Sequence, residues 1–469
     1  MPKYNYKKLM CIQRERQSTV SRASVIDEFY SDRSRIIYCS AFRRLQQKAQ
    51  VFSLESNSSV RTRLTHSIEV SDLGRTIANN IGKRLLNQKI ISVRSVPYIV
   101  SIVENACLLH DIGNPPFGHF GETAIKEWAQ NCSETACPDY VKKNDLLLLL
   151  IKDFQEFDGN PQGFRTVTKL YTDHDKCSLN LTYATLLCCL KYSRAAGEEK
   201  GDGILKKAGY FQSEKRLVEK LWNEVGITPH HRYPLTYIME AADDIAYCMS
   251  DIADGIEKNI LSEEDFCKAF FEEWKSTYKE ETIPVNLPEN LKGFNRDISI
   301  PWSKFAMDSA IDNYFNNHET FYEGSGSELI SEDSPAGKLL KVVKHVSRKR
   351  LYTSIQAESI ELTGYAVITG ILQSYEKMLL LPYDKFSSLV NHEKIDNVEV
   401  ERRLFNRIGS RYVDAYKYAL EEYSTSSSNF YTYEWWLRTH MLIDHVSGMT
   451  DEFALETYQM LKGISLMRV

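Results

Sequence analysis

The feature that most constrains the fold of this chain is a long apolar stripe with helical spacing between Pro234 and Glu257. Apolar residues stand at positions 235, 238, 239, 242, 245, 246, 249, 252, 253 and 256. Spacings of three and four residues return side chains to one face of an α-helix, so the segment is predicted to be a helix packed on the core.

Similar spacing predicts further helices at 64–86, 96–111, 181–192, 361–381 and 399–422. Ser334 followed by Pro335 is typical of a helix start, because serine caps the first turn and proline is tolerated at its first position. Alternating strand patterns with hairpin turns are nearly absent. We therefore predict an all-α protein with at most a short hairpin.

The chain has 469 residues, a length that suits two or three domains or one large helical body. Irregular segments are expected at 281–301, 323–334 and 424–429, but none has the length and composition of a linker. We therefore expect residues 1–469 to form a single large body.

Composition narrows the possible functions. The formal net charge of -5 argues against general coating of polyanions, so phosphate contacts must come from local basic clusters such as 61–63 and 206–207. The ten cysteines show no CxxC spacing, which argues against a zinc-finger cage or a redox pair. The start of the sequence lacks the apolar core of a signal peptide, and the longest apolar run, 146–151, is too short for a membrane span. A cytoplasmic location without membrane contact is expected.

The stretch "LLHDIGNPPFGHFGE" places two adjacent metal-ligand types, His110 and Asp111, directly before a break in the chain. Neighbouring side chains on a helix point about 100° apart, but at a helix end opened by glycine and prolines they can converge on one ion. His66 and Asp243 are the best further candidates. Imidazole with carboxylate suits Mn, Fe, Co, Zn or Mg. The alternative for each residue alone is an ordinary buried histidine or a solvated aspartate.

These residues lie in motifs that resemble those of a known family. "RTRLTHSIEV", "CLLHDIGNPPFGHFGE", "GNPQGFR", "LNLTYA", "MEAADDIAYC" and "SGMTDEFA" resemble bacterial dGTP triphosphohydrolases of the HD phosphohydrolase superfamily, over essentially the whole chain. The resemblance implies an HD-type helical fold with additional helices. Its metal-binding core would lie at about 60–260, and a C-terminal part at about 334–469 would contribute to the substrate site and to oligomer contacts.

The resemblance also implies the reaction and its residues. A divalent metal, usually Mg or Mn, supports cleavage of dGTP into deoxyguanosine and inorganic triphosphate by attack of water on the α-phosphorus. The implied metal ligands are His66, His110, Asp111 and Asp243, and the implied acid–base pair is His119 with Glu122.

The implied substrate-binding residues fall into three groups. The residues implied to bind the triphosphate are Arg63, Asn160, Lys191, Tyr192 and Lys207. Those implied to bind the sugar are Gln50, Tyr247 and Asp251, and those implied to bind the base are Glu361 and Lys394. By helical wheel, Asp251 lies opposite the apolar stripe of its helix and is expected to face a cleft. Lys394 stands where the family typically has arginine, and lysine lacks the planar fork of arginine, so strict preference for guanine is open.

Family members are commonly homo-oligomers, often hexamers, and some respond to single-stranded DNA. Three alternatives stay open: a nucleotide-activated triphosphohydrolase acting on several dNTPs, a single-stranded nucleic-acid-binding protein with a vestigial site, and an HD phosphodiesterase. The last would need additional histidine ligands for a second metal, and the sequence has none beside the HD pair.

Overall fold

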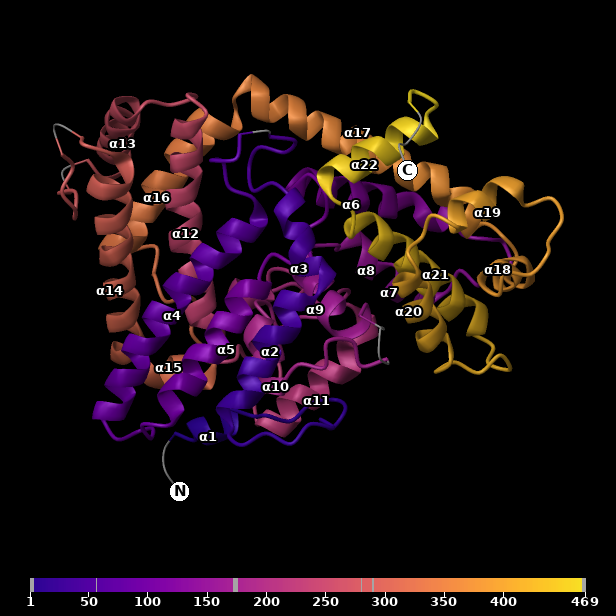
Figure 1. Cartoon of the computed structure of the whole chain (residues 1–469), viewed down its shortest axis with the longest axis horizontal. Coiled ribbons are helices and arrows are strands. Elements are labelled where there is room, and N and C mark those ends of the chain that lie inside the picture. Colours follow the sequence, from indigo (N-terminus) through magenta and orange to yellow (C-terminus); the bar gives the residue numbers. More distant parts are fainter. Residues whose placement is uncertain (1–3, 56, 172–175, 280, 289–290, 466–469) are drawn as a thin grey trace.

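The computed structural model describes residues 4–55, 57–171, 176–279, 281–288 and 291–465. Helices make up the fold, and the extended pairings among these residues are isolated bridges of Ala49 with Thr62 and of Ala195 with Tyr210 (Figure 1). The prediction of an all-α protein is confirmed.

The first part of the chain supplies α1 (Tyr6–Leu9), α2 (Ile26–Tyr38), α3 (Ser40–Arg44), α4 (Arg63–Asn87), α5 (Ser95–Leu109), α6 (Gly118–Thr135), α7 (Asp145–Leu150), α8 (Lys152–Gln155), α9 (Gly159–Lys169), α10 (Tyr183–Cys189), α11 (Lys215–Val225) and α12 (Thr236–Glu257). The second part supplies α13 (Glu263–Tyr278), α14 (Ile300–Asn316), α15 (His318–Glu323), α16 (Pro335–Ser347), α17 (Ile355–Leu379), α18 (Tyr383–Val390), α19 (Glu399–Phe405), α20 (Ser410–Leu420), α21 (Phe430–Ser447) and α22 (Asp451–Leu461). Short 3-10 turns at Leu45–Gln47, Gly203–Leu205 and Gln212–Glu214, and π-helical turns at Asn295–Ser299 and Arg348–Tyr352, connect them.

The long predicted helices agree with α4, α5, α10, α12, α16 and α17 to within a few residues. Ser334 caps α16 by accepting a hydrogen bond from the backbone N of Gly337. The single helix expected at 399–422 is wrong, since α19 ends at Phe405 and α20 begins at Ser410. Gly409 has extended backbone angles there, and this interrupts an otherwise continuous apolar spacing.

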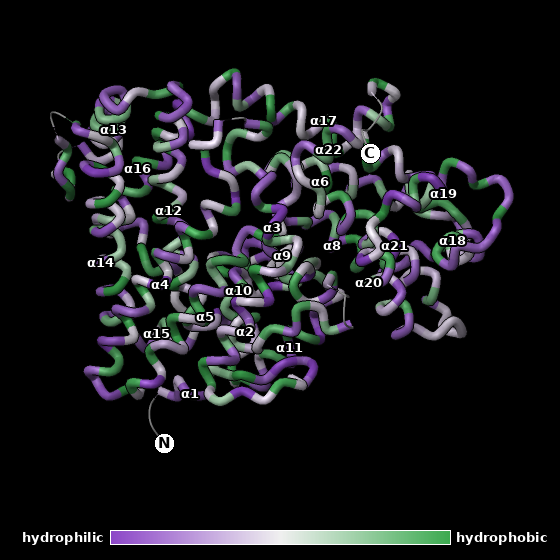
Figure 2. Tube along the Cα trace, viewed as in Figure 1, coloured by the Kyte–Doolittle hydropathy of each residue, from purple (hydrophilic) through white to green (hydrophobic). Residues whose placement is uncertain are grey.

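Two hydrophobic cores organise the molecule. The first core joins α2, α4, α5 and α10–α14 with α16. The second core joins α6–α8 from the first third of the sequence to α17–α21 and the start of α22. Figure 1 shows α12–α14 and α16 at one end and α18–α21 at the other, and Figure 2 shows apolar and polar residues interspersed along them. Within the described part of the chain, no helix combines the length and apolarity needed to cross a bilayer.

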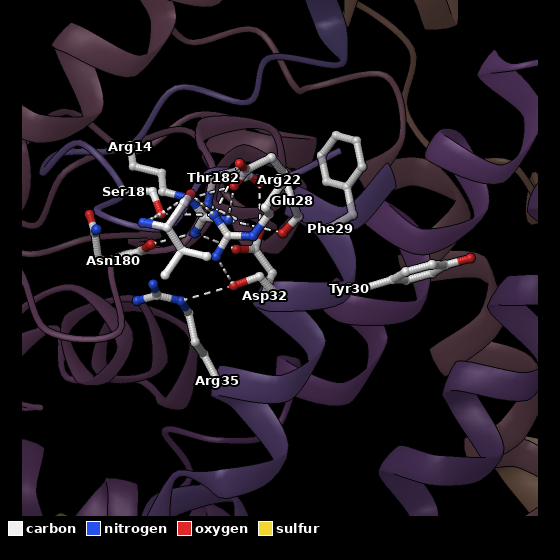
Figure 3. A network of polar contacts seen from close by, with 12 residues as sticks. Arg14, Ser18, Arg22, Glu28, Phe29, Tyr30, Asp32, Arg35, Asn180 and Thr182 are labelled. Atoms are coloured by element: carbon white, nitrogen blue, oxygen red, sulfur yellow. Dashed lines mark hydrogen bonds and ion pairs between the residues drawn. The ribbon is translucent and has the colours of Figure 1, made fainter. Parts of the chain in front are cut away.

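A buried polar network fixes the N-terminal segment against the first core (Figure 3). Arg14 donates to Oδ1 of Asp32 and to the backbone O of Asn180, both at 2.6 Å. The other oxygen of Asp32 accepts from the backbone N and the hydroxyl of Thr182, at 3.1 and 2.6 Å. Because Thr182 is the N-cap of α10, this network sets the helix that leads to Lys191.

Candidate active site and metal centre

Four side chains from three helices and one turn gather at one point. One nitrogen or oxygen each of His66, His110 and Asp111 lie within 4.8 Å of one another. Oδ1 of Asp243 lies 3.5 Å from Nε2 of His66 and 3.4 Å from Nε2 of His110. These residues come from α4, the end of α5, the following turn and α12.

The local chemistry of this cluster fits a divalent cation. Both ring nitrogens of His66 and Nε2 of His110 are buried and have no hydrogen-bond partner among the described residues. Unpaired buried polar atoms are costly unless something binds them, and a metal ion held by the Nε2 atoms of His66 and His110 would satisfy those two atoms. Burial disfavours the charged form of Asp243, but His110, Lys191 and His66 outweigh burial and hold its pKa well below the ordinary value.

The end of α5 and the turn that follows it give the cluster its geometry. His110 closes α5, and its Nδ1 lies 2.7 Å from the backbone O of Cys107, which leaves Nε2 to face the cluster. Asp111 begins the turn that Pro115 and Pro116 extend, and Nη1 of Arg63 donates to its Oδ2 at 2.8 Å. The helix end therefore allows adjacent residues to reach a common centre, as the sequence indicated.

The two residues predicted as an acid–base pair are in contact. Nδ1 of His119 lies 3.1 Å from Oε2 of Glu122, one turn later on α6. Oε1 of Glu122 accepts from the backbone N of Gly159 at 2.8 Å, so both carboxylate oxygens have partners. The pair lines the same pocket as His110 and Asp111.

A pocket of about 440 Å³ lies over the cluster, large enough for a nucleotide-sized ligand. It brings together most of the residues that the sequence singled out. Its lining includes Gln50, Arg63, His110, Asp111, His119, Glu122, Asn160, Lys191, Tyr192, Lys207, Asp243, Tyr247 and Glu361. His66 lies behind this surface and is fully buried.

The cationic side chains of the pocket are held by carboxylates. Nζ of Lys191 lies 3.4 Å from Oδ2 of Asp243, and Nζ of Lys207 donates to Oδ2 of Asp158 at 2.7 Å. Burial lowers the pKa of Lys191, but Asp243 and Glu240 outweigh burial and keep its pKa well above the ordinary value. Both ammonium groups are therefore charged and fixed where they line the pocket.

At the other side of the pocket, Tyr247 and Asp251 are joined through Tyr352. The hydroxyl of Tyr352 donates to Oδ2 of Asp251, so the hydroxyl of Tyr247 donates to the oxygen of Tyr352. Asp251 is 1% exposed and does not line the pocket directly, in contrast to the cleft-facing position that the helical wheel indicated. The reason is that α12 is covered on nearly all sides.

The two residues assigned to the base lie apart. Glu361 lines the pocket from α17, whereas Lys394 lies in an exposed loop after α18, outside it. Lys394 was predicted to reach the base bound in a neighbouring subunit. The structure contains one chain, so this role stays a prediction.

Sequence reasoning missed several pocket residues, among them Tyr352, Lys344 and Asp158. Tyr352 and Lys344 line the pocket, and Nζ of Lys344 donates to Oδ1 of Asp244 at 3.0 Å. Asp158 also lines it and caps α9 by accepting from the backbone N of Asn160. The basic run that ends in "KHVSRKRLY" was the one available signal for the first two.

The fold and the His–Asp cluster define a helical protein of the HD class, and the HD domain family model matches residues 63–148. Two curated relatives extend the match to nearly the whole chain. The deoxyguanosinetriphosphate triphosphohydrolase of Enterobacter sp. (strain 638) is 35% identical, over 96% of this chain and 97% of its own length. The one of Klebsiella pneumoniae (strain 342) is 34% identical, over 93% and 94%. The chain therefore belongs to the deoxyguanosinetriphosphate triphosphohydrolase family.

Proposed function

We propose that this protein hydrolyses dGTP to deoxyguanosine and inorganic triphosphate, with Mg or Mn as the metal. The observation that carries the proposal is the convergence of His66, His110, Asp111 and Asp243 beside the His119–Glu122 pair, in one pocket of nucleotide size. The relatives at 34–35% identity bear the name of this activity.

The four ligand residues would hold one divalent cation, which when bound polarises the α-phosphate and favours ionisation of water. A set of two imidazoles and two carboxylates suits Mn, Fe, Co, Zn or Mg, and the family resemblance favours Mn or Mg among them. Arg63 fixes the orientation of Asp111 through its Nη1 donor.

His119 and Glu122 would move the protons of the reaction. The oxygen of water bonds to the α-phosphorus, the bond from phosphorus to the 5′ oxygen breaks, and the 5′ oxygen gains a proton. Glu122 is 4% exposed and holds the imidazole of His119, whose side chain is 81% exposed and able to meet substrate. General acid–base groups need this combination of a fixed partner and an accessible proton.

The remaining pocket residues would bind the substrate in order along its length. Lys191, Lys207, Tyr192 and Asn160 line the region suited to the triphosphate, where charged donors bind phosphate oxygens strongly. Tyr247 would pack against the deoxyribose and exclude a 2′-hydroxyl by its bulk. Gln50 and Tyr352 would contact the sugar hydroxyl, with Asp251 behind Tyr352 accepting its hydroxyl proton, and Glu361 would accept from guanine nitrogens.

A product assay tests the proposal. Purified protein is incubated with Mn or Mg and each dNTP in turn, and products are separated by ion exchange. We expect triphosphate and deoxyguanosine from dGTP, and no product from His110→Ala. Release of pyrophosphate or orthophosphate would contradict the proposed bond cleavage. Comparable rates on all four dNTPs, seen when they are mixed, would favour a nucleotide-activated enzyme of broader specificity.

We also propose a cytoplasmic homo-oligomer, with a hexamer as the family's common form. Ile355 and Leu362 near the start of α17 are 82% and 68% exposed in the single chain, and Lys394 lies in an exposed loop. Exposed large apolar side chains next to a site support burial by another copy. Light scattering coupled to gel filtration gives the number of subunits, and the same experiment with added oligonucleotide tests single-stranded DNA as an effector.

A further inference from the structure

A carboxylate from the C-terminal helix α22 contacts the turn that leads into α6. Asp451, the first residue of α22, is 3% exposed. Its Oδ1 accepts from the backbone N of Phe117 at 3.0 Å, and its Oδ2 accepts from the backbone N of Ala49 at 3.1 Å. One side chain thus joins two segments that border the pocket, more than 300 residues earlier in the chain.

Phe117 needs such support because its backbone is in the left-handed region. Its φ of 60° and ψ of 20° are uncommon for a residue other than glycine, asparagine or aspartate. Its side chain also packs against Gly364 of α17, where any side chain would collide with it. The turn therefore adopts an unfavourable conformation, and residues distant in sequence must hold it.

Lys48 makes a second connection between the same parts of the chain. Its ammonium group is buried and donates to the backbone O of Asn114 and, at 2.8 Å, to the backbone O of Ser447. The segments 48–49, 114–117 and 447–451 are therefore joined by four hydrogen bonds, two donated by the buried side chain of Lys48 and two accepted by the buried side chain of Asp451.

We propose that Asp451 is a positioning residue that holds the Phe117 turn and thereby sets His119 and Glu122 over the pocket. The inference rests on the proposed function for the role of that pair. Loss of the carboxylate would leave the amide of Phe117 unpaired and allow the start of α6 to shift. His66, His110 and Asp243 lie on or at the end of helices of the first core, and Arg63 of α4 holds Asp111 at the start of the turn, so metal binding should be retained.

The test is the Asp451→Asn variant of the full-length protein, which keeps the volume but places a donor against one of the two backbone amides. We expect kcat for dGTP to fall about tenfold to a hundredfold, because small displacements of a reacting group have effects of this size. KM and the half-saturating Mn concentration should stay within about twofold of the wild-type values, since the variant should lose stabilisation of the transition state and not binding of substrate or metal. Glu452→Gln, the next position on α22 and exposed, is the matched control.

Unchanged kcat in folded Asp451→Asn, or equal losses in kcat and in Mn affinity, would overturn the proposal. Hydrogen exchange of the wild-type protein supplies a test that does not need the variant to fold. The amide of Phe117 should be protected, although amides at helix starts ordinarily lack partners, and rapid exchange there would also overturn it. If the wild-type protein releases no triphosphate, the proposed function fails while the protection of Phe117 can still be observed.

Discussion

Glu122 is fixed at both of its carboxylate oxygens, whereas His119, which it contacts, is open to solvent. Oε2 of Glu122 lies 3.1 Å from Nδ1 of His119, and Oε1 accepts from the backbone N of Gly159 at 2.8 Å. The buried member of the pair therefore connects the imidazole to α9, and the exposed imidazole is left accessible to substrate.

Replacing Glu122 with Gln should lower kcat by about 10²–10⁴-fold, the usual contribution of a general acid–base group. The amide keeps the shape of the side chain but removes the charge that orients the His119 ring. Steady-state kinetics with dGTP measure the effect. Glu134→Gln, an exposed position on the same helix, should retain wild-type activity. A Glu122→Gln enzyme with wild-type kcat would exclude the pair from proton transfer.

Metal binding should stabilise the fold. A ligand present at one hundred times its Kd raises the free energy of unfolding by about 2.7 kcal/mol, provided that it binds only the folded state. Differential scanning fluorimetry with added Mn should therefore show a higher Tm for the wild-type protein. His66→Ala should lose most of the shift, and His392→Ala, an exposed histidine in the loop after α18, should keep it. An equal shift in all three proteins would place the ion elsewhere.

Asp251 should make stability depend on pH. Burial raises its pKa from 3.8 to about 7. Because the folded state favours the protonated carboxyl, its contribution to stability declines as pH rises from about 4 to 7 and is constant above that. With a chelator present to remove metal ions, Asp251→Asn should unfold at a higher temperature than wild type at pH 8. The difference in the free energy of unfolding should be up to roughly 4 kcal/mol. Below pH 4 the two proteins should be alike.

The same pH series also gives the outcome that would contradict this expectation. A constant difference in Tm between Asp251→Asn and wild type from pH 4 to pH 8 would mean that the carboxyl does not titrate there. We expect the stabilised variant to bind dGTP more weakly, since Asp251 holds the Tyr352 hydroxyl that is proposed to contact the sugar.

Tyr247 should control selection against ribonucleotides. Removing the ring in Tyr247→Ala opens space beside the sugar, so the ratio of kcat/KM for dGTP to that for GTP should fall at least about tenfold, the effect of a lost contact of 1–2 kcal/mol. Tyr247→Phe keeps the ring and loses only the hydroxyl that bonds to Tyr352, so it should still reject GTP. Equal selectivity in the alanine and phenylalanine variants would assign the discrimination to another residue.

What could be predicted from the sequence was mostly local. The stripe of α12 and the cap at Ser334 depend on neighbours within a few turns, so the helices they predicted are present. The gathering of His110 and Asp111 could also be predicted, because the end of α5 marks a point where adjacent ligands can converge, and His66 joins them as the motifs indicated. The pairing of His119 with Glu122 follows from their spacing of three residues.

What could not be predicted depends on segments distant in sequence. A helical wheel places Asp251 away from the apolar stripe, yet Tyr352 covers it from a segment about a hundred residues later. The place of Lys344 in the pocket has the same origin, since it depends on segments that the sequence keeps far apart. No pattern around Asp451 indicates that its carboxylate reaches Phe117.

The division of the chain between two cores has a consequence for its synthesis. α6, which bears His119 and Glu122, packs mainly against α17 of the second core, and to a lesser extent against α8. While the ribosome is still making the last third of the protein, this helix can pack on α8 but lacks α17, and the hydrogen bonds to Asp451 do not exist. We therefore expect the proposed site to be complete only after the final helices have emerged.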